Sequence, residues 1–219
     1  MLKSENQIFR KRCEKIAENL SRQVMRMPWD NKSFYAAWLA QTYYFVSHST
    51  RLLALAAARF HIDQDETHQR FISHMSEEKR HERLCLHDLK AIGVELNEIP
   101  EMAQTKAFYQ RQYYLIEHVC PESFFGYILC LELLAVMVGK NAHDVVKRAH
   151  GEKSGSFLGV HSADDIEHIE QAFNSISHLP NEILTTITEN LESSCQIYAA
   201  MCAQIVQSQQ VSDNQTQAA

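Results

Sequence analysis

The stretch "GYILCLELLAVMVG", residues 126–139, is almost wholly apolar and carries one carboxylate, Glu132, in its middle. A run of this length and composition is typical of a helix buried in a protein core. An ionised carboxylate without a partner is costly in an apolar interior, so Glu132 must be protonated, paired or bound to a cation. The positions three and four residues away on a helix hold only aliphatic side chains. The partner of Glu132 must therefore come from another segment of the chain.

The composition of the chain is that of a soluble globular protein. Its 219 residues, 45% apolar and 22% charged, suit one domain with a full-sized core. The net charge of −6 and the lack of a basic run argue against a nucleic-acid partner. The N-terminus carries charges throughout and lacks the apolar core of a signal peptide, and Glu132 interrupts the one segment that approaches the length of a membrane span. The six cysteines are scattered and form no CxxC motif, which indicates reduced thiols. We therefore expect a cytoplasmic protein that binds neither nucleic acid nor membrane.

The apolar pattern is helical almost throughout, and no alternating strand of convincing length occurs. Asp30 or Asn31 can cap the second predicted helix, Gly93 can close the third, and "GEKSGS" is the clearest loop. The sequence predicts an all-α bundle, with a single domain over residues 1–208 and a flexible polar tail at 209–219. The predicted helices cover roughly residues 4–26, 32–59, 64–92, 100–118, 122–150, 162–178 and 181–208.

The third predicted helix offers one group of partners for Glu132 in "HMSEEKRHERLCLHD", residues 74–88. Glu78 lies three residues before His81, and Glu77 lies four before it, so either pair can face one metal ion. A helical wheel puts Glu78 within the apolar face and Glu77 further out, so we prefer Glu78. A Glu-x-x-His pair on one helix is how carboxylate-bridged di-iron bundles supply ligands. The same string is also typical of an exposed charged turn, and a short match alone is weak evidence.

The sixth predicted helix offers another group in "HSADDIEH", residues 161–168. His161, Asp165 and His168 are spaced four and three residues apart, so their side chains share one stripe of a helix. Two imidazoles and a carboxylate suit non-haem iron. Alternatively, Ser162 caps the helix and the acids stabilise its first turn, but this leaves both histidines unexplained.

Taken together, the segments supply three carboxylates and three imidazoles. These residues are Glu78, His81, Glu132, His161, Asp165 and His168. That set suits two iron ions and would be unusual for zinc, which favours four-coordinate sites often rich in cysteine. Bound cations would neutralise Glu132. Without a cation, three buried carboxylates are expected to repel one another and to raise one another's pKa.

These motifs resemble those of the haem-oxygenase-like di-iron oxidases and oxygenases, also called iron-containing redox enzymes. The resemblance covers roughly residues 34–172 and rests on "HSTRLLALAAARF" (48–60), "HMSEEKRHE" (74–82), the Glu of "CLELL" and "HSADDIEH", which is its most specific part. It implies the seven-helix haem-oxygenase-like bundle shared with thiaminase-type and pyrroloquinoline-quinone-synthase-type proteins. It also implies one or two Fe²⁺ ions as cofactor, O₂ as co-substrate, a small-molecule substrate and a homodimer. The six residues named above match the family's ligand positions.

The sequence departs from the family pattern in one respect. Di-iron members usually take a further glutamate from the helix that matches residues 32–59, and this chain has no acidic residue from Asn31 to His61. Gln41 or His48 could take its place, or a single iron could bind. We also expect Tyr44 and His48 to orient an intermediate or to pass protons. His48 is equally well explained as a core histidine that donates to a backbone carbonyl.

Two other functions remain open on the sequence. A metal-free enzyme of the thiaminase type would use Cys130 as its nucleophile, although a small buried hydrophobe is the simpler explanation of this cysteine. Such an enzyme would have little use for His161 and His168. A non-catalytic binding protein would line a pocket with the aromatic residues of 108–118, but an aromatic stripe in a bundle is usually core.

Overall fold

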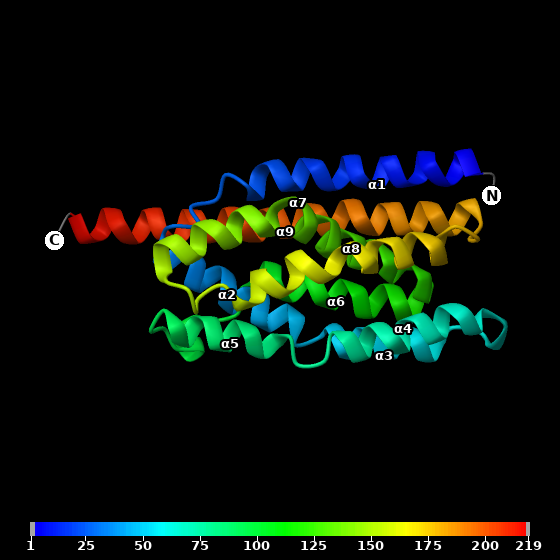
Figure 1. The fold of residues 1–219 in the computed structure, drawn as a ribbon, viewed down its shortest axis with the longest axis horizontal. Coiled ribbons are helices and arrows are strands. Elements are labelled where there is room, and N and C mark those ends of the chain that lie inside the picture. The colour runs from blue at the N-terminus through cyan, green and yellow to red at the C-terminus, as the bar shows by residue number, and fades with distance from the viewer. Residues whose placement is uncertain (1–2, 218–219) are drawn as a thin grey trace.

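The chain folds as a bundle of α-helices (Figure 1). In the computed structural model, the backbone is described for residues 3–217 and the side chains for residues 6–161 and 168–209. The helices of this described backbone are α1 Lys3–Val24, α2 Lys32–Val46, α3 Ser49–Arg59, α4 Asp65–Glu77, α5 Glu82–Ala91, α6 Ala103–His118, α7 Phe124–His150, α8 Ser156–Ile176 and α9 Asn181–Gln217. Three short 3-10 helices, Ile62–Gln64, Leu96–Glu98 and Pro121–Ser123, lie between them, and no strand occurs in these residues. The predicted all-α fold is confirmed.

The helices lie at the seven predicted places, but two of the predicted segments are each divided. The segment 32–59 breaks after α2, where the hydroxyl of Ser47 donates to the carbonyl of Tyr43 at 2.6 Å. A side chain that bonds to the backbone of its own helix in this way often bends it. The segment 64–92 breaks between α4 and α5, where Arg80 has a φ of 73°. That left-handed conformation cannot continue a right-handed helix.

The N-terminus of α8 differs from the prediction in a way that matters for the site. The helix begins at Ser156, and both oxygens of the Asp88 carboxylate accept from its first N–H groups, that of Ser156 at 3.0 Å and that of Phe157 at 2.9 Å. Asp88 is fully buried, so it fixes this end of α8 to α5 from inside the bundle. The expectation that Ser162 caps the helix is wrong, because residue 162 lies inside α8.

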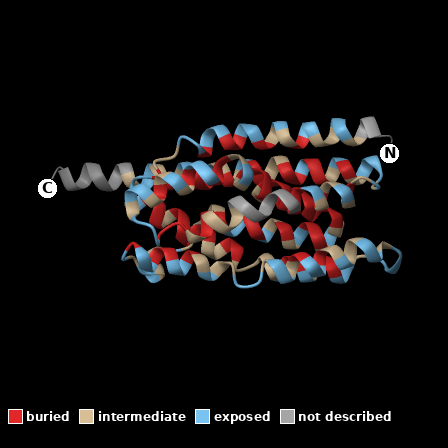
Figure 2. Cartoon of the chain, in the orientation of Figure 1, coloured by how far each residue is buried: buried red, intermediate tan, exposed pale blue. Residues whose placement is uncertain are grey.

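Helix α7 lies in the core of the bundle and packs against α1, α8 and α9. The edge opposite α1 is formed by α3, α4 and α5 (Figure 1), and buried residues lie on the helix faces that point inward (Figure 2). Within the described residues, the segment Pro121–His150 is long and apolar enough to span a membrane, but 78% of its most apolar window is buried in the protein. Burial of this extent is what a core helix requires.

The close packing of α7 on α9 depends on Gly126. A Cβ atom at this position would lie 2.3 Å from the carbonyl oxygen of Ile187 and 2.7 Å from the backbone nitrogen of Leu191.

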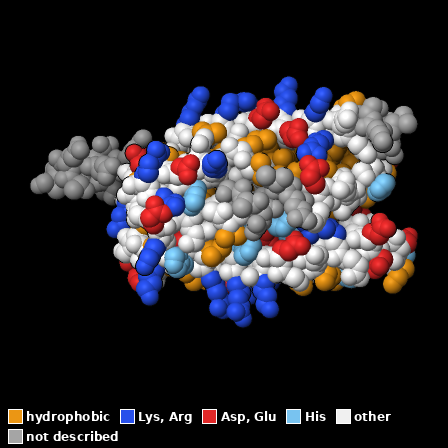
Figure 3. Space-filling model, viewed as in Figure 1, with side chains coloured by type: hydrophobic (Ala, Val, Ile, Leu, Met, Phe, Trp, Pro, Cys, Tyr) orange, Lys and Arg blue, Asp and Glu red, His pale blue; other side chains and the backbone are white. Residues whose placement is uncertain are grey.

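On the face shown in Figure 3, acidic and basic side chains are both widely spread, with basic ones along its two long edges.

Candidate metal centre

Two groups of metal-ligating side chains meet where α4, α5, α7 and α8 come together. In the first group, ligand atoms of His74, Glu78 and His168 all lie within 4.8 Å of one another. In the second group, the same holds for Glu78, His81 and His161. Glu78 belongs to both groups. The described residues therefore form two candidate metal positions that share one carboxylate.

The break between α4 and α5 places three of these side chains. His74 lies in the last turn of α4, Glu78 directly follows that helix, and His81 directly precedes α5. Glu78 and His81 were expected on one unbroken helix, but they lie on a turn that contains the left-handed Arg80. For a residue with a Cβ atom, this conformation costs roughly 1–2 kcal/mol. Strain of this kind is concentrated at functional sites, where the surrounding structure enforces it.

The position of Glu132 answers the question raised by the apolar stretch. Its Oε1 atom lies 3.3 Å from Nε2 of His74 and 3.7 Å from Nδ1 of His168. All three side chains are largely buried. The carboxylate in the middle of α7 therefore faces imidazoles from α4 and α8.

The electrostatics of the centre are governed by the contact between Glu78 and the histidines. Burial by itself raises the pKa of Glu78, but the imidazoles of His74 and His81, together with the nearby His161, hold this pKa well below its usual range. The contacts are 3.7 Å from His74 Nε2 to Oε1 of Glu78 and 3.3 Å from His81 Nδ1 to its Oε2. The expectation that crowded carboxylates raise one another's pKa is therefore wrong for Glu78. Imidazoles lie beside this carboxylate and stabilise its charge.

Glu77 lies outside both donor groups but is held against one of them. Its Oε2 atom lies 3.1 Å from Nε2 of His168, whose Nδ1 faces Glu132. Ser73 donates to the other oxygen of Glu77 at 3.0 Å, and an Arg70 nitrogen lies 3.3 Å from Oε2. A carboxylate on the outer nitrogen of an imidazole fixes the orientation of the ring, as it does for many metal-binding histidines.

The sequence prediction missed His74 although the residue lies in the motif "HMSEEKRHE". Its spacing of four residues before Glu78 was the available signal. Of the six predicted ligand residues, five are brought together: Glu78, His81, Glu132, His161 and His168. The side chain of the sixth, Asp165, lies outside the described residues.

The residues expected from the helix at 32–59 are not part of this centre. Tyr44 donates its hydroxyl proton to a backbone carbonyl of the α5–α6 connection at 2.8 Å. His48 contacts the hydroxyl of Tyr113 through Nδ1 at 2.9 Å. The amide of Gln41 bonds to residues of the segment 100–105. The structure therefore gives Tyr44 and His48 no contact with the donor groups, and His74 is the additional ligand candidate in place of Gln41 or His48.

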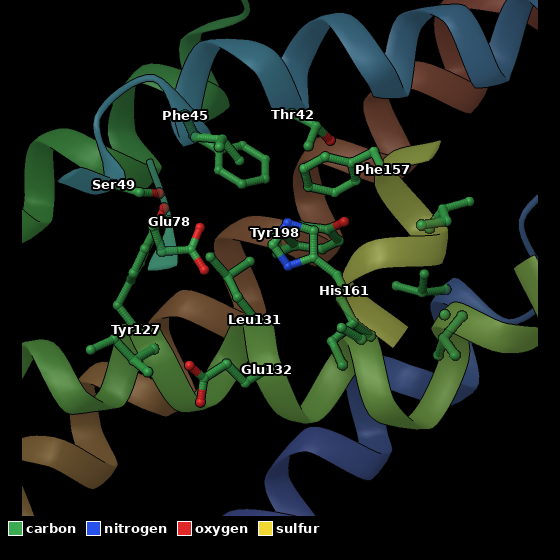
Figure 4. A pocket seen from close by; sticks show the side chains of 18 of the residues that line it. Thr42, Phe45, Ser49, Glu78, Tyr127, Leu131, Glu132, Phe157, His161 and Tyr198 are labelled. Atoms are coloured by element: carbon green, nitrogen blue, oxygen red, sulfur yellow. The ribbon is translucent and has the colours of Figure 1, made fainter. Parts of the chain in front are cut away.

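A cavity of about 110 Å³ adjoins the donor groups. Figure 4 shows Glu78, Glu132 and His161 pointing into it from three different elements, with Leu131 between them. His74 also lies on its wall, and most of the remaining wall is aliphatic or aromatic. A molecule in this cavity would lie against the side chains that could hold a metal.

Cys130 is placed poorly for a nucleophile. Its sulfur lies 3.5 Å from that of Cys195 in the interior between α7 and α9, and Cys130 is not among the residues that line the cavity. Burial raises the pKa of its thiol well above the ordinary value. A protonated thiol that does not line the cavity does not suit nucleophilic catalysis there.

The donor set fits iron. The described residues supply four imidazoles and two carboxylates from His74, Glu78, His81, Glu132, His161 and His168, and no cysteine takes part. Nitrogen and oxygen donors in this proportion suit non-haem iron, and a shared glutamate is typical of helical bundles that hold two ions. A structural zinc site would require four donors in one closed shell.

Comparison with known proteins gives one family and several solved structures. The family described as iron-containing redox enzyme matches residues 36–199 of this chain. No match is found among curated proteins. A domain of unknown function with a heme oxygenase-like fold from Shewanella denitrificans OS217 aligns with a TM-score of 0.81 and 18% identity, over 91% of this chain and 92% of that one.

Two TenA homologues also share the fold. One, from Pyrococcus furiosus, aligns with a TM-score of 0.71 and 17% identity, over 90% of this chain and 99% of that one. The other, from Pseudomonas syringae pv. tomato DC3000, aligns with a TM-score of 0.74 and 11% identity, over 91% of this chain and 93% of that one. At these identities the likeness shows the fold alone, which is the haem-oxygenase-like bundle.

Proposed function

Because this chain belongs to the family of iron-containing redox enzymes, we propose that it is a non-haem iron oxidase or oxygenase that uses O₂ to oxidise a small molecule. The observation that supports this proposal best is the presence of Glu78 in both donor groups. A carboxylate that lies between two sets of imidazoles is placed to bind two cations at once. The proposed cofactor is therefore a pair of Fe²⁺ ions.

The proposed ligands fall into two sets on either side of Glu78. His74, His168 and Glu132 would hold one ion, and His81 and His161 would hold the other. Bound ferrous iron would supply the electrons that reduce O₂. Imidazoles and carboxylates bind metal ions only when deprotonated, so iron binding at this site should weaken as the pH falls.

The remaining residues of the centre would orient the ligands and keep bulk water away. Glu77 would hold the ring of His168 through Nε2 and leave Nδ1 directed at the centre. The mostly apolar cavity would exclude water from the reacting molecule, which limits loss of reactive species to solvent.

A metal-free enzyme on the same scaffold is the alternative, because TenA homologues share the fold. The burial of Cys130 and its contact with Cys195 argue against a nucleophilic cysteine at the cavity. The alternative also gives no role to four histidines around two glutamates. Metal content distinguishes the two functions.

The test is elemental analysis of protein purified without oxygen from iron-supplied cells, together with O₂ consumption after reduction. The proposal predicts bound iron in the wild type and its loss in His168→Ala. His118→Ala is the matched control, because His118 is exposed at the end of α6. Wild-type protein that holds no iron and consumes no O₂ would overturn the proposal and favour the metal-free enzyme.

A further inference from the structure

The walls of the cavity beside the candidate metal centre disfavour an anionic ligand. Its lining comes mainly from α2, α7 and α8 and is aliphatic and aromatic over most of its area. No lysine or arginine occurs among the described residues that line it, whereas Glu78 and Glu132 do. An anionic group in the cavity would therefore be desolvated beside two carboxylates, with no lysine or arginine to pair with. The cavity suits a neutral molecule.

Two buried hydroxyl groups on the cavity wall have no hydrogen-bond partner among the described residues. They are Oγ1 of Thr42 on α2 and the phenol oxygen of Tyr127 on α7, in side chains 1% and 2% exposed. Leaving a buried polar group unsatisfied costs roughly 1–3 kcal/mol. A ligand atom that accepts or donates a hydrogen bond would satisfy such groups in a cavity wall.

Other buried hydroxyls in the described part of the bundle have hydrogen-bond partners, so these two are exceptional there. Thr188, buried in α9, donates to the carbonyl of Leu184 one turn earlier at 2.8 Å. The hydroxyl of Tyr198, which also lines the cavity, accepts a hydrogen bond from the indole of Trp38 at 2.9 Å. Thr42 could make the same bond to its own helix as Thr188 and does not. Its hydroxyl is therefore available to a ligand.

The size and lining of the cavity limit what could occupy it. Its volume of about 110 Å³ is smaller than the roughly 150 Å³ of an engineered apolar cavity that binds benzene. Aromatic side chains dominate one side, where Figure 4 shows Phe45 and Phe157 near Thr42. Aromatic walls favour a ring packed edge-to-face or offset against them. A single ring, or an apolar body of that size, is what fits.

We propose that this cavity binds a small neutral molecule with a ring-sized apolar body and a hydroxyl or carbonyl oxygen that hydrogen-bonds to Thr42 or to Tyr127. The inference rests on the proposed function for what happens to the bound molecule, because the donor groups adjoin it. Binding itself needs only the cavity and the two hydroxyls. The iron-free protein can therefore test it separately.

The experiment uses calorimetric titration of the iron-free, full-length protein with three probes that share one ring. Benzyl alcohol is neutral with a hydroxyl, toluene is neutral without one, and benzoate is anionic. We expect benzyl alcohol to bind, toluene to bind about tenfold more weakly, since one good hydrogen bond is lost, and benzoate to show no binding.

Two variants test whether the hydroxyls of Thr42 and Tyr127 cause the preference for benzyl alcohol over toluene. Thr42→Val and Tyr127→Phe each remove a hydroxyl and keep the approximate shape of the side chain. In the double variant, benzyl alcohol should bind no more tightly than toluene, whereas toluene affinity should stay unchanged. The melting temperature of each single variant should be equal to or above that of the wild type, because an unsatisfied buried group is removed. Thr188→Val is the matched control, since it loses a satisfied hydroxyl and should melt lower with wild-type binding of benzyl alcohol.

Three results would overturn the inference: no binding of any probe, benzoate binding as tightly as benzyl alcohol, or undiminished preference for benzyl alcohol in the double variant. Iron content reports separately on the proposed function. A protein that binds benzyl alcohol as described but holds no iron would keep this inference and lose the oxygenase. A protein that binds two irons but none of the probes would keep the oxygenase proposal and overturn this inference.

Discussion

The carboxylate of Glu132, in the middle of the core helix α7, lies 3.3 Å from Nε2 of His74 at the end of α4. This contact joins the core helix α7 to the edge of the bundle, where the chain breaks between α4 and α5. Both side chains are largely buried, so solvent screens their interaction poorly. The centre is thus built into the core of the protein.

Replacing Glu132 with Gln tests its role as a ligand. The amide keeps the shape of the side chain and removes its charge, so Fe²⁺ affinity should fall by at least about tenfold. Stability of the iron-free protein should change by less than about 1 kcal/mol, since an amide can still hydrogen-bond to an imidazole. Anaerobic iron titration and thermal melting measure both. Glu122→Gln, at a buried glutamate bonded to Gln64, should leave iron binding unchanged; equal iron affinity in both variants would contradict a ligand role for Glu132.

Glu77 provides a test of positioning as distinct from ligation. Glu77→Gln should weaken iron binding about 10–100-fold, because the ring of His168 is no longer held by a charged acceptor. The number of irons bound at saturation should stay the same. Stoichiometry and affinity from one anaerobic titration separate these effects. A drop in the number of bound irons would show instead that Glu77 is itself a ligand.

Asp88 tests how the helix that carries His161 and His168 is anchored. Its carboxylate accepts from the first two N–H groups of α8 and is fully buried. Asp88→Ala leaves those groups without their acceptor and should lower the free energy of unfolding by about 2–3 kcal/mol. Urea denaturation measures the change. A loss below about 0.5 kcal/mol would mean that α8 is held by other contacts.

The lowered pKa of Glu78 predicts a dependence of stability on pH. Its folded-state pKa lies below that of the unfolded chain, about 4.3 for glutamate, so its ionised form stabilises the fold at higher pH. That contribution is lost as the pH falls from about 5 towards the folded-state pKa. Glu78→Gln lacks this titration, so the iron-free wild type should lose more stability than the variant between pH 5 and pH 3. Parallel stability curves for the two proteins would contradict the assigned shift.

Much of the fold could be predicted from local patterns. The apolar run around Glu132 predicted a buried helix, and α7 is that helix. The spacing of His161 and His168 put both on one helical stripe, and the structure directs both toward Glu78. These predictions succeeded because each depends on periodicity within one segment.

The features that were missed depend on where segments break and meet. Arg80 adopts a left-handed conformation that favours glycine or asparagine, so nothing local marked the turn that separates Glu78 from His81. The prediction that Tyr44 and His48 act at the site took residues 32–59 as one unbroken helix, whereas the chain breaks after α2. The cavity is instead lined by Thr42 from α2 and Ser49 from α3. His74 was missed although its spacing from Glu78 was a local signal; its contact with Glu132 depends on tertiary packing.

The most direct test of the central claim is the stoichiometry of anaerobic Fe²⁺ binding to wild-type protein and to Glu78→Ala. If Glu78 is shared between two metal positions, the wild type should bind two equivalents of iron per chain. Its melting temperature should rise as iron is added, because a ligand that binds only the native state stabilises it. Removing the shared carboxylate should weaken both positions together, so that Glu78→Ala binds less than one equivalent under the same conditions. Wild-type protein that binds no iron, or a Glu78→Ala variant that still binds two equivalents, would contradict the account.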